Sequence, residues 1–365
     1  MRGKFGSSMG RLSSRTADPS MCALDASNGA VETARMVKRV AMWLAAAGLA
    51  LAAQASTAQT YAPPRHSEPP PLYGYLPEPE LLKLANSGLT VERNRTPAEI
   101  LAEHRKLSQA LGQLQPQRKG TVDAYVLSVG LDSDPVFGRE AREAGRVLAR
   151  RYGAEGRALT LAGTEGSAPS ALPMGSPEAI AAALARIAEL MDTKEDVLVL
   201  YTTSHGAKWG IVYSDANQGF GAISPYRLYR MLEDLGLANR LILLSACHAG
   251  VFVPVLASPT TIVASAASAE KTSFGCAAEN DWTFFGDALV NHALRKPQPF
   301  AAAWKEADGT IGGWERDGKL TPSQPQLSVG RQTGWLAALE KKMPRTASAP
   351  VGKPATLALE SARPR

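Results

Sequence analysis

Residues 121–340 alternate between continuous apolar runs of strand length and segments whose apolar residues recur at helical spacing. The apolar runs predict strands at 123–130, 157–163, 197–203, 241–245 and 260–265, with a short added strand at 210–214 and an edge strand at 326–329. Helical spacing, Ser-Pro starts and a glycine end predict helices at 137–151, 176–191, 224–235, 283–295 and 300–309. Strands and helices that alternate in this way predict an α/β fold, with a mostly parallel sheet covered by helices on both faces.

Two of the predicted strands end on reactive side chains. The run at 197–203 is followed by Ser204-His205-Gly206, and the run at 241–244 continues into Ser245-Ala246-Cys247-His248-Ala249-Gly250, with Cys247 forty-two positions after His205. In open parallel sheets, ligands bind outside the carboxyl ends of the strands. We therefore expect the thiol and the imidazole at the same edge of one sheet.

A thiol beside an imidazole is the minimal equipment of a cysteine nucleophile. The thiolate attacks, and histidine supplies or takes the proton near neutral pH. The backbone N–H groups of Gly206 and Cys247 are candidates for an oxyanion hole. The alternatives are that Cys247 is a buried core residue and that His205 bonds a loop carbonyl. His248, next to the thiol, is a candidate surface residue, substrate contact or rival proton donor.

At these residues the chain resembles the legumain and GPI-transamidase family of cysteine peptidases, and within it the bacterial exported members. The resemblance rests on Tyr201 to Gly206, on Ser245 to Gly250 and on the segments 272–276 and 284–287, and it covers roughly 125–330. It implies a caspase-like three-layer α/β sandwich. It also implies that Cys247 attacks a peptide carbonyl and that His205 protonates the leaving amine.

The same resemblance implies four substrate-binding residues. These are Arg139, Ser245, Ser265 and Asp287. Legumain has an acidic residue where this chain has Ser245, so a strict preference for asparagine is not expected. Arg139 and Asp287 can equally be read as a solvated charge and a helix-face carboxylate.

No cofactor or metal is expected. The sequence has no H-E-x-x-H, C-x-x-C or P-loop motif, and Gly219-Phe220-Gly221 lacks the third glycine of a dinucleotide site. The net charge is +6, of which residues 1–55 carry +4, so a nucleic-acid partner has little electrostatic support.

The N-terminal region has the pattern of a signal peptide. A basic segment at 36–39 precedes an apolar run at 40–53 and the small residues of Ala53-Gln54-Ala55. We expect residues 1–58 to be an N-terminal extension plus signal peptide or anchor, with translation starting at Met1 or Met36. The predicted location is the periplasm or the outer side of the inner membrane, with possible membrane association through the apolar segment. In that oxidising setting Cys247 and Cys276 could form a structural disulfide.

Three further parts complete the predicted organisation. Residues 59–120 combine a Pro-rich linker with an amphipathic helix that starts at the capping box Thr96-Pro97-Ala98-Glu99. Residues 121–340 form the peptidase domain, and residues 341–365 are expected to be a disordered tail.

The leading hypothesis is an exported cysteine endopeptidase acting on peptides or proteins. A transpeptidase would use the same acyl-enzyme and stays open. A non-catalytic pseudo-peptidase, binding a partner through its N-terminal helix, is the alternative from another class.

Overall fold

A computed structural model describes residues 75–162, 170–357 and 359 of the chain, all within the compact unit Tyr61–Arg365. The expected signal peptide and extension at 1–58, and the linker up to residue 74, lie outside the described residues. Among the helices that are described, none combines the length and the apolar character that a membrane span requires.

A mostly parallel sheet forms the centre of the domain. Within the described residues it has six strands in the order β10-β9-β8-β4-β2-β3, and only β10 runs antiparallel to its neighbour. The strands are β2 (Ala124–Gly130), β3 (Ala158–Leu161), β4 (Val197–Thr203), β8 (Arg240–Ser245), β9 (Thr261–Ser265) and β10 (Gln326–Val329). The predicted sheet is therefore confirmed.

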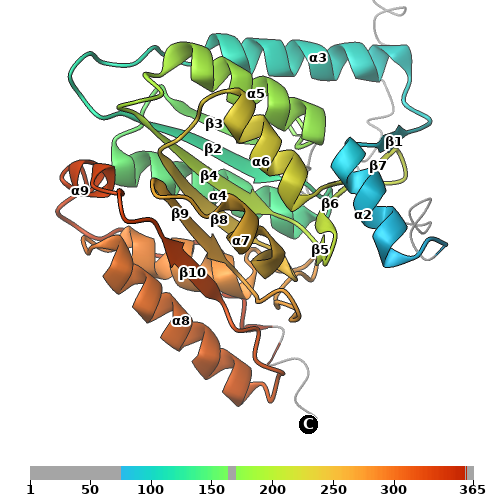
Figure 1. Cartoon of the computed structure of the whole chain (residues 1–365). Helices are drawn as coiled ribbons and strands as arrows, with labels where there is room; N and C mark the ends of the chain where they lie inside the picture. The colour runs from blue at the N-terminus through green and yellow to red at the C-terminus, as the bar shows by residue number, and fades with distance from the viewer. Residues whose placement is uncertain (1–74, 163–169, 358, 360–365) are drawn as a thin grey trace, which may run out of the picture. The chain divides into compact units, whose positions relative to one another are not determined.

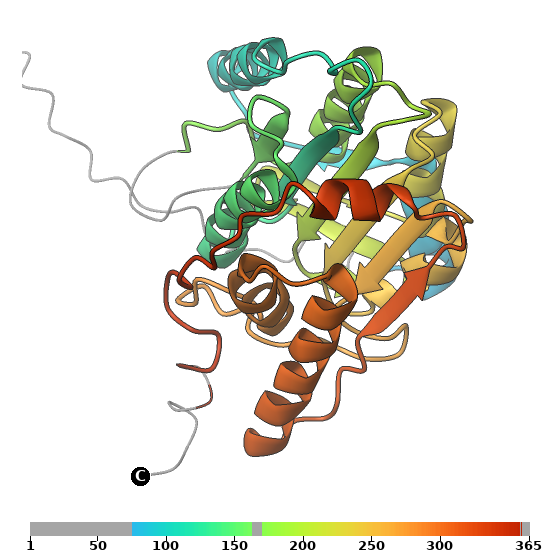
Figure 2. The same cartoon turned by 90° about the vertical axis from the view of Figure 1, so that its left-hand side faces the viewer.

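Helices cover both faces of this sheet (Figures 1 and 2). Successive strand residues point to opposite faces, so Val126 packs with one layer and Leu127 with the other. One layer holds α4 (Pro135–Tyr152), η2 (Gly286–His292), α8 (Phe300–Asp317) and α9 (Trp335–Glu340). The other holds α5 (Pro177–Leu190), α6 (Pro225–Asp234) and α7 (Val253–Leu256). The result is the predicted three-layer α/β sandwich.

Local sequence explains where the helices of the second layer begin. Ser176 and Ser224 are N-caps whose hydroxyls accept hydrogen bonds from Ala179 N (3.1 Å) and Arg227 N (3.0 Å). Each is followed by proline at the first helical position, where its missing N–H costs nothing.

A small antiparallel sheet is formed by three strands that follow β4 in the sequence and by one strand from the N-terminal region. It contains β1 (Thr90–Glu92), β7 (Gly219–Ile223), β6 (Gly210–Asp215) and β5 (Gly206–Ala207), in that order. The pattern predicted only the β6 strand. Gly219-Phe220-Gly221, discounted above as a nucleotide loop, lies in β7 and pairs with both β6 and β1.

The amphipathic helix of the N-terminal region is α3 (Pro97–Gly112). Thr96 accepts a hydrogen bond from Glu99 N, and Glu99 accepts one from Thr96 N, which completes the predicted capping box. The helix packs on α5, with Leu107 and Leu111 half-buried against the core. Further helical structure precedes it in α2 (Glu78–Ser87).

The C-terminal half departs from the prediction in two respects. The helix expected at 283–295 is present, but as a π-helix, η2, continued by the short 3₁₀ turn η3 (Ala293–Arg295). Residues 341–357, expected in a disordered tail, instead pack along the domain: Ala355 is fully buried, and Val351 O accepts a hydrogen bond from Trp282 Nε1 (2.8 Å). We call residues 349–357 the C-terminal strap. Its low hydrophobicity misled the prediction, because backbone hydrogen bonds rather than apolar side chains hold it.

Removing the strap is expected to destabilise the domain. A chain ending at Pro350 loses the Ala355 N–H donor to the buried Asp287 carboxylate, so its free energy of unfolding should fall by about 3 kcal/mol. Urea unfolding measures the change. A chain lacking only residues 361–365 is the matched control, and equal midpoints for the two truncations would contradict a structural role for the strap.

Candidate active site

The pairing of β4 with β8 brings the two predicted catalytic residues to one edge of the sheet. The strands are parallel, with Thr203 opposite Ser245. His205 and Cys247 each lie two residues beyond this pair, and both line one small cavity. The expected meeting of imidazole and thiol is thus present in the structure.

Gly206 allows the close approach of the two strand ends. A Cβ atom added at this position would lie 2.0 Å from the carbonyl oxygen of Cys247 and 3.0 Å from the Cβ of Ala246. Such contacts are far inside van der Waals distance, so only glycine fits between His205 and the turn that carries the thiol.

The cavity is small. Its volume is about 10 Å³, close to the room that one water molecule needs. Its lining residues are Ser204, His205, Ser245, Ala246, Cys247, Ser273, Phe274, Cys276 and Thr283. We call residues 269–281, which carry three of them, the covering loop. This loop therefore limits the room beside the sulfur.

The covering loop contacts the thiol directly. Ser273 N donates a hydrogen bond to Cys247 Sγ at 3.2 Å, and the thiol lies 3.6 Å from Ser273 O. Burial raises the pKa of Cys247, and Cys276 nearby raises it further, against the lowering effects of Ser273 N–H and His205. Because its pKa lies above the ordinary value for cysteine, Cys247 favours the thiol form at neutral pH.

His248 fastens the covering loop rather than facing the thiol. It adopts a left-handed backbone (φ 56°), as the chain turns from β8 into η1 (Ala249–Phe252). Its N–H donates to Lys271 O (2.8 Å), and its Nδ1 lies 2.9 Å from Ala269 O. The structure therefore indicates that His248 positions the covering loop, which is none of the three roles considered from the sequence.

His205 has an acidic partner that the sequence pattern missed. Its Nε2 lies 3.6 Å from Asp134 Oδ2, and its ring packs edge-on against Phe137. Burial lowers the pKa of His205, but Asp134 and the neighbouring Cys276 thiol outweigh it and bring the pKa to about 10. The imidazole is therefore a cation at neutral pH. Asp134 follows β2, which neighbours β4, and that position was the available signal.

Of the four predicted substrate-binding residues, only Ser245 lines the cavity. Ser265 is fully buried, and its hydroxyl donates to Ala267 O (3.0 Å). Arg139 donates to the carbonyls of Ala278 (2.6 Å) and Asn280 (2.5 Å) and pairs with Asp281 at 2.8 Å. Its guanidinium therefore binds the C-terminal end of the covering loop and does not line the cavity.

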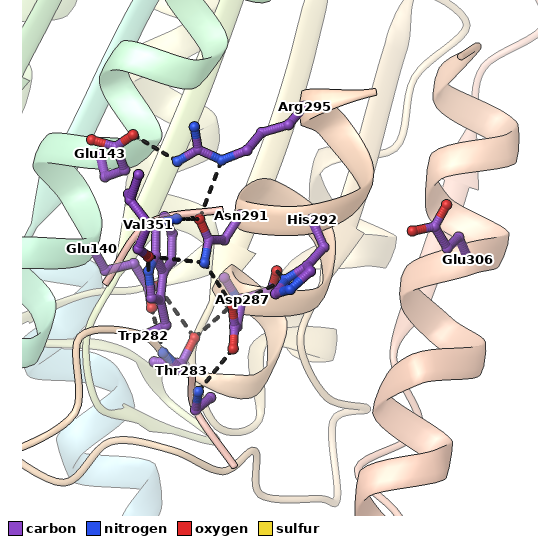
Figure 3. Close-up of polar contacts among 12 residues, drawn as sticks. Glu140, Glu143, Trp282, Thr283, Asp287, Asn291, His292, Arg295, Glu306 and Val351 are labelled. Atoms are coloured by element: carbon purple, nitrogen blue, oxygen red, sulfur yellow. Dashed lines mark hydrogen bonds and ion pairs between the residues drawn. The ribbon is translucent and has the colours of Figure 1, made fainter. Parts of the chain in front are cut away.

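Asp287 lies in a buried polar network away from the cavity lining (Figure 3). Its carboxylate accepts hydrogen bonds from Asn291 Nδ2 (2.8 Å) and from Ala355 N of the strap (2.8 Å). His292 Nδ1 lies 3.1 Å away, and Asp287 raises the pKa of His292. The expectation that Asp287 binds substrate is not met, because the side chain is fully buried and its bonds fix the strap.

A second buried acid lies directly behind the cavity wall. Glu140 accepts hydrogen bonds from Tyr201 Oη (2.6 Å) and Thr283 N (2.5 Å). The Thr283 hydroxyl in turn lies 2.9 Å from Ser245 Oγ, and both residues line the cavity. Burial raises the pKa of Glu140, against the lowering effect of these hydrogen bonds, and the side chain supports Thr283 in the cavity wall. In the sequence it resembles any helix glutamate.

Comparisons with known proteins give one family match. Residues 175–305 match the profile of the Peptidase C13 family, which is the legumain family that the two motifs resemble. No curated protein matches the chain. Among solved structures, caspase-1 from Spodoptera frugiperda is similar at 14% identity with a TM-score of 0.37, over 60% of this chain and 88% of that one. The family match supports a cysteine peptidase.

Replacing Asp134 by asparagine is expected to lower the pKa of His205. Without the carboxylate, the cation keeps only its burial penalty and weaker partners, so the pKa should fall from about 10 by about 1–3 units. NMR titration of the His205 ring measures it. His292, whose partner is Asp287, should titrate unchanged in the same sample, and a common shift of both rings would point to unfolding instead.

Proposed function

We propose that this chain, whose residues 175–305 match the Peptidase C13 family, is a cysteine endopeptidase with Cys247 as nucleophile and His205 as proton donor. The observation that carries the proposal is the strand register, which sets both side chains around one cavity at the carboxyl ends of β4 and β8. Parallel sheets bind their ligands at this edge.

The reaction begins with a proton leaving the site. At rest the thiol is protonated and the imidazole is cationic, so the reactive pair of thiolate and imidazolium forms when Cys247 releases its proton to solvent. Displacement of the covering loop exposes the sulfur to water and removes part of the burial that disfavours the thiolate. One movement of the covering loop would therefore both admit the substrate and favour the thiolate.

Acyl transfer then follows the usual balance of a thiol peptidase. The Cys247 sulfur bonds to the carbonyl carbon, the C–N bond breaks, and His205 gives its proton to the departing amine. The neutral imidazole next takes a proton from water, whose oxygen displaces the sulfur and releases the acid. Asp134, 3.6 Å from the ring, holds the imidazolium in place through the first step.

The oxyanion of each tetrahedral intermediate needs donors. We assign this role to the backbone N–H groups of Gly206 and Cys247, which lie on the two apposed strand ends. Side chains are not required for it, in keeping with a glycine at position 206.

The proposal includes a place of action. The basic and apolar pattern at 36–55 supports an exported protein, periplasmic or attached to the outer side of the inner membrane. Peptides or proteins reaching that compartment are the proposed substrates.

Peptidase activity tests the assignment directly. Cleavage of a peptide library by the reduced full chain should fall roughly a thousand-fold in Cys247→Ala and in His205→Ala, because each removes one half of the acyl-transfer pair. His104→Ala, on the exposed face of α3, is the matched histidine control and should cleave like the unchanged chain.

Several outcomes would reject the assignment. Equal cleavage by the unchanged chain and by Cys247→Ala would do so, and so would a folded chain that cleaves no member of the library. The second result would favour the pseudo-peptidase. Transfer of the acyl group to an added amine in preference to water would instead identify a transpeptidase.

A further inference from the structure

A second thiol lies in the same cavity as the first. Cys247 and Cys276 are both free and half-buried, and together with His205 they line a space with room for about one water molecule. His205 lies within hydrogen-bonding reach of Cys276, and each sulfur is close enough to affect the charge state of the site. The mechanism proposed above uses only one of these thiols.

Fixed backbone contacts hold Cys276 at this position. The preceding Gly275 has φ 91°, a conformation that favours glycine, and its carbonyl accepts a hydrogen bond from Asn280 Nδ2 (2.9 Å). On either side, Phe284 N bonds Phe274 O (2.9 Å) and the Arg139 guanidinium binds Ala278 O. The loop thus returns on itself at Cys276 and directs that residue toward the cavity.

We propose that Cys276 is a resolving thiol, which forms a reversible disulfide with Cys247 when the site meets a peroxide. This inference rests on the proposed role of Cys247 as nucleophile. The disulfide would switch the peptidase off and would protect its sulfur.

The chemistry closes without a further reactant. The Cys247 thiolate attacks one oxygen of hydrogen peroxide, the O–O bond breaks, and the sulfur becomes a sulfenic acid. The Cys276 thiolate then attacks that sulfur. The S–S bond forms, the S–O bond breaks, and the leaving hydroxide takes a proton from His205 to depart as water. Overall, two thiols lose two electrons and two protons, and one peroxide becomes two waters.

The shared cavity brings the two residues that would form this bond to one place. A disulfide needs Cα atoms about 4.4–6.8 Å apart. Both cysteines line the same small cavity, and Cys276 lies on the covering loop, whose displacement the proposed function includes. Without a resolving thiol, the sulfenic acid would proceed to sulfinic acid, which ordinary thiol reductants do not reverse.

The test uses the full chain carrying Cys22→Ser, which removes the one cysteine outside the described residues. After treatment with equimolar hydrogen peroxide and blocking of free thiols with iodoacetamide, the intact mass should lack both alkyl groups and two hydrogens. Digestion should yield a peptide in which Cys247 and Cys276 are joined. Dithiothreitol should restore both thiols and at least about nine-tenths of the cleavage activity.

Cys276→Ser is the informative variant. With two equivalents of hydrogen peroxide, one for each oxidation step, its Cys247 should reach sulfinic acid and dithiothreitol should restore no activity, whereas the Cys22→Ser chain should recover after the same dose. The inference is overturned if the Cys22→Ser chain stays fully alkylated after peroxide, if it links only between molecules, or if Cys276→Ser recovers equally well.

The disulfide and the peptidase can fail separately. If the peroxide-treated chain gives the linked peptide but the reduced chain cleaves nothing, the result would support the thiol pair and reject the proposed function. An active peptidase with no linked peptide would do the reverse.

Discussion

The parallel pairing of β4 with β8 is the constraint on which the rest of the site depends. It sets Thr203 opposite Ser245, and this pair determines where the residues that follow the two strands enter the cavity. Side chains alternate between the faces of a sheet, so a slip of one residue would send the apolar set of one strand into the wrong layer. Because both faces are buried, the core itself fixes the register and, with it, the distance between imidazole and thiol.

Buried polar groups complete what the register begins. Glu140 supports Thr283 behind the cavity, Asp287 binds the C-terminal strap, and Arg139 holds the covering loop by its carbonyls. Each of these charged or polar groups has left water, and each is satisfied by partners far away in sequence. Networks of this kind stabilise only when every member is present, so they tie the cavity wall, the covering loop and the strap to the same folded state.

The sequence predicted the parts of this molecule that local patterns control. Continuous apolar runs located β2, β4, β8 and β9, Ser-Pro pairs located the starts of α5 and α6, and strand ends located His205 and Cys247. It failed where long-range partners decide the outcome. Asp287 accepts a hydrogen bond from a strap residue sixty-eight positions later. Asp134 lies near His205 only because β2 pairs with β4. Likewise, no local pattern separates Cys276 in the cavity from a cysteine on any loop.

Docking of the C-terminal strap completes the hydrogen bonding of Asp287 during folding. Asp287 belongs to η2, yet one of its donors is synthesised sixty-eight residues later. Until that segment docks, the Asp287 carboxylate lacks the Ala355 N–H donor and keeps the hydrogen bond from Asn291, while η2 packs against α4 and α8. The surroundings of η2 are therefore complete only once the C-terminal end of the chain has docked.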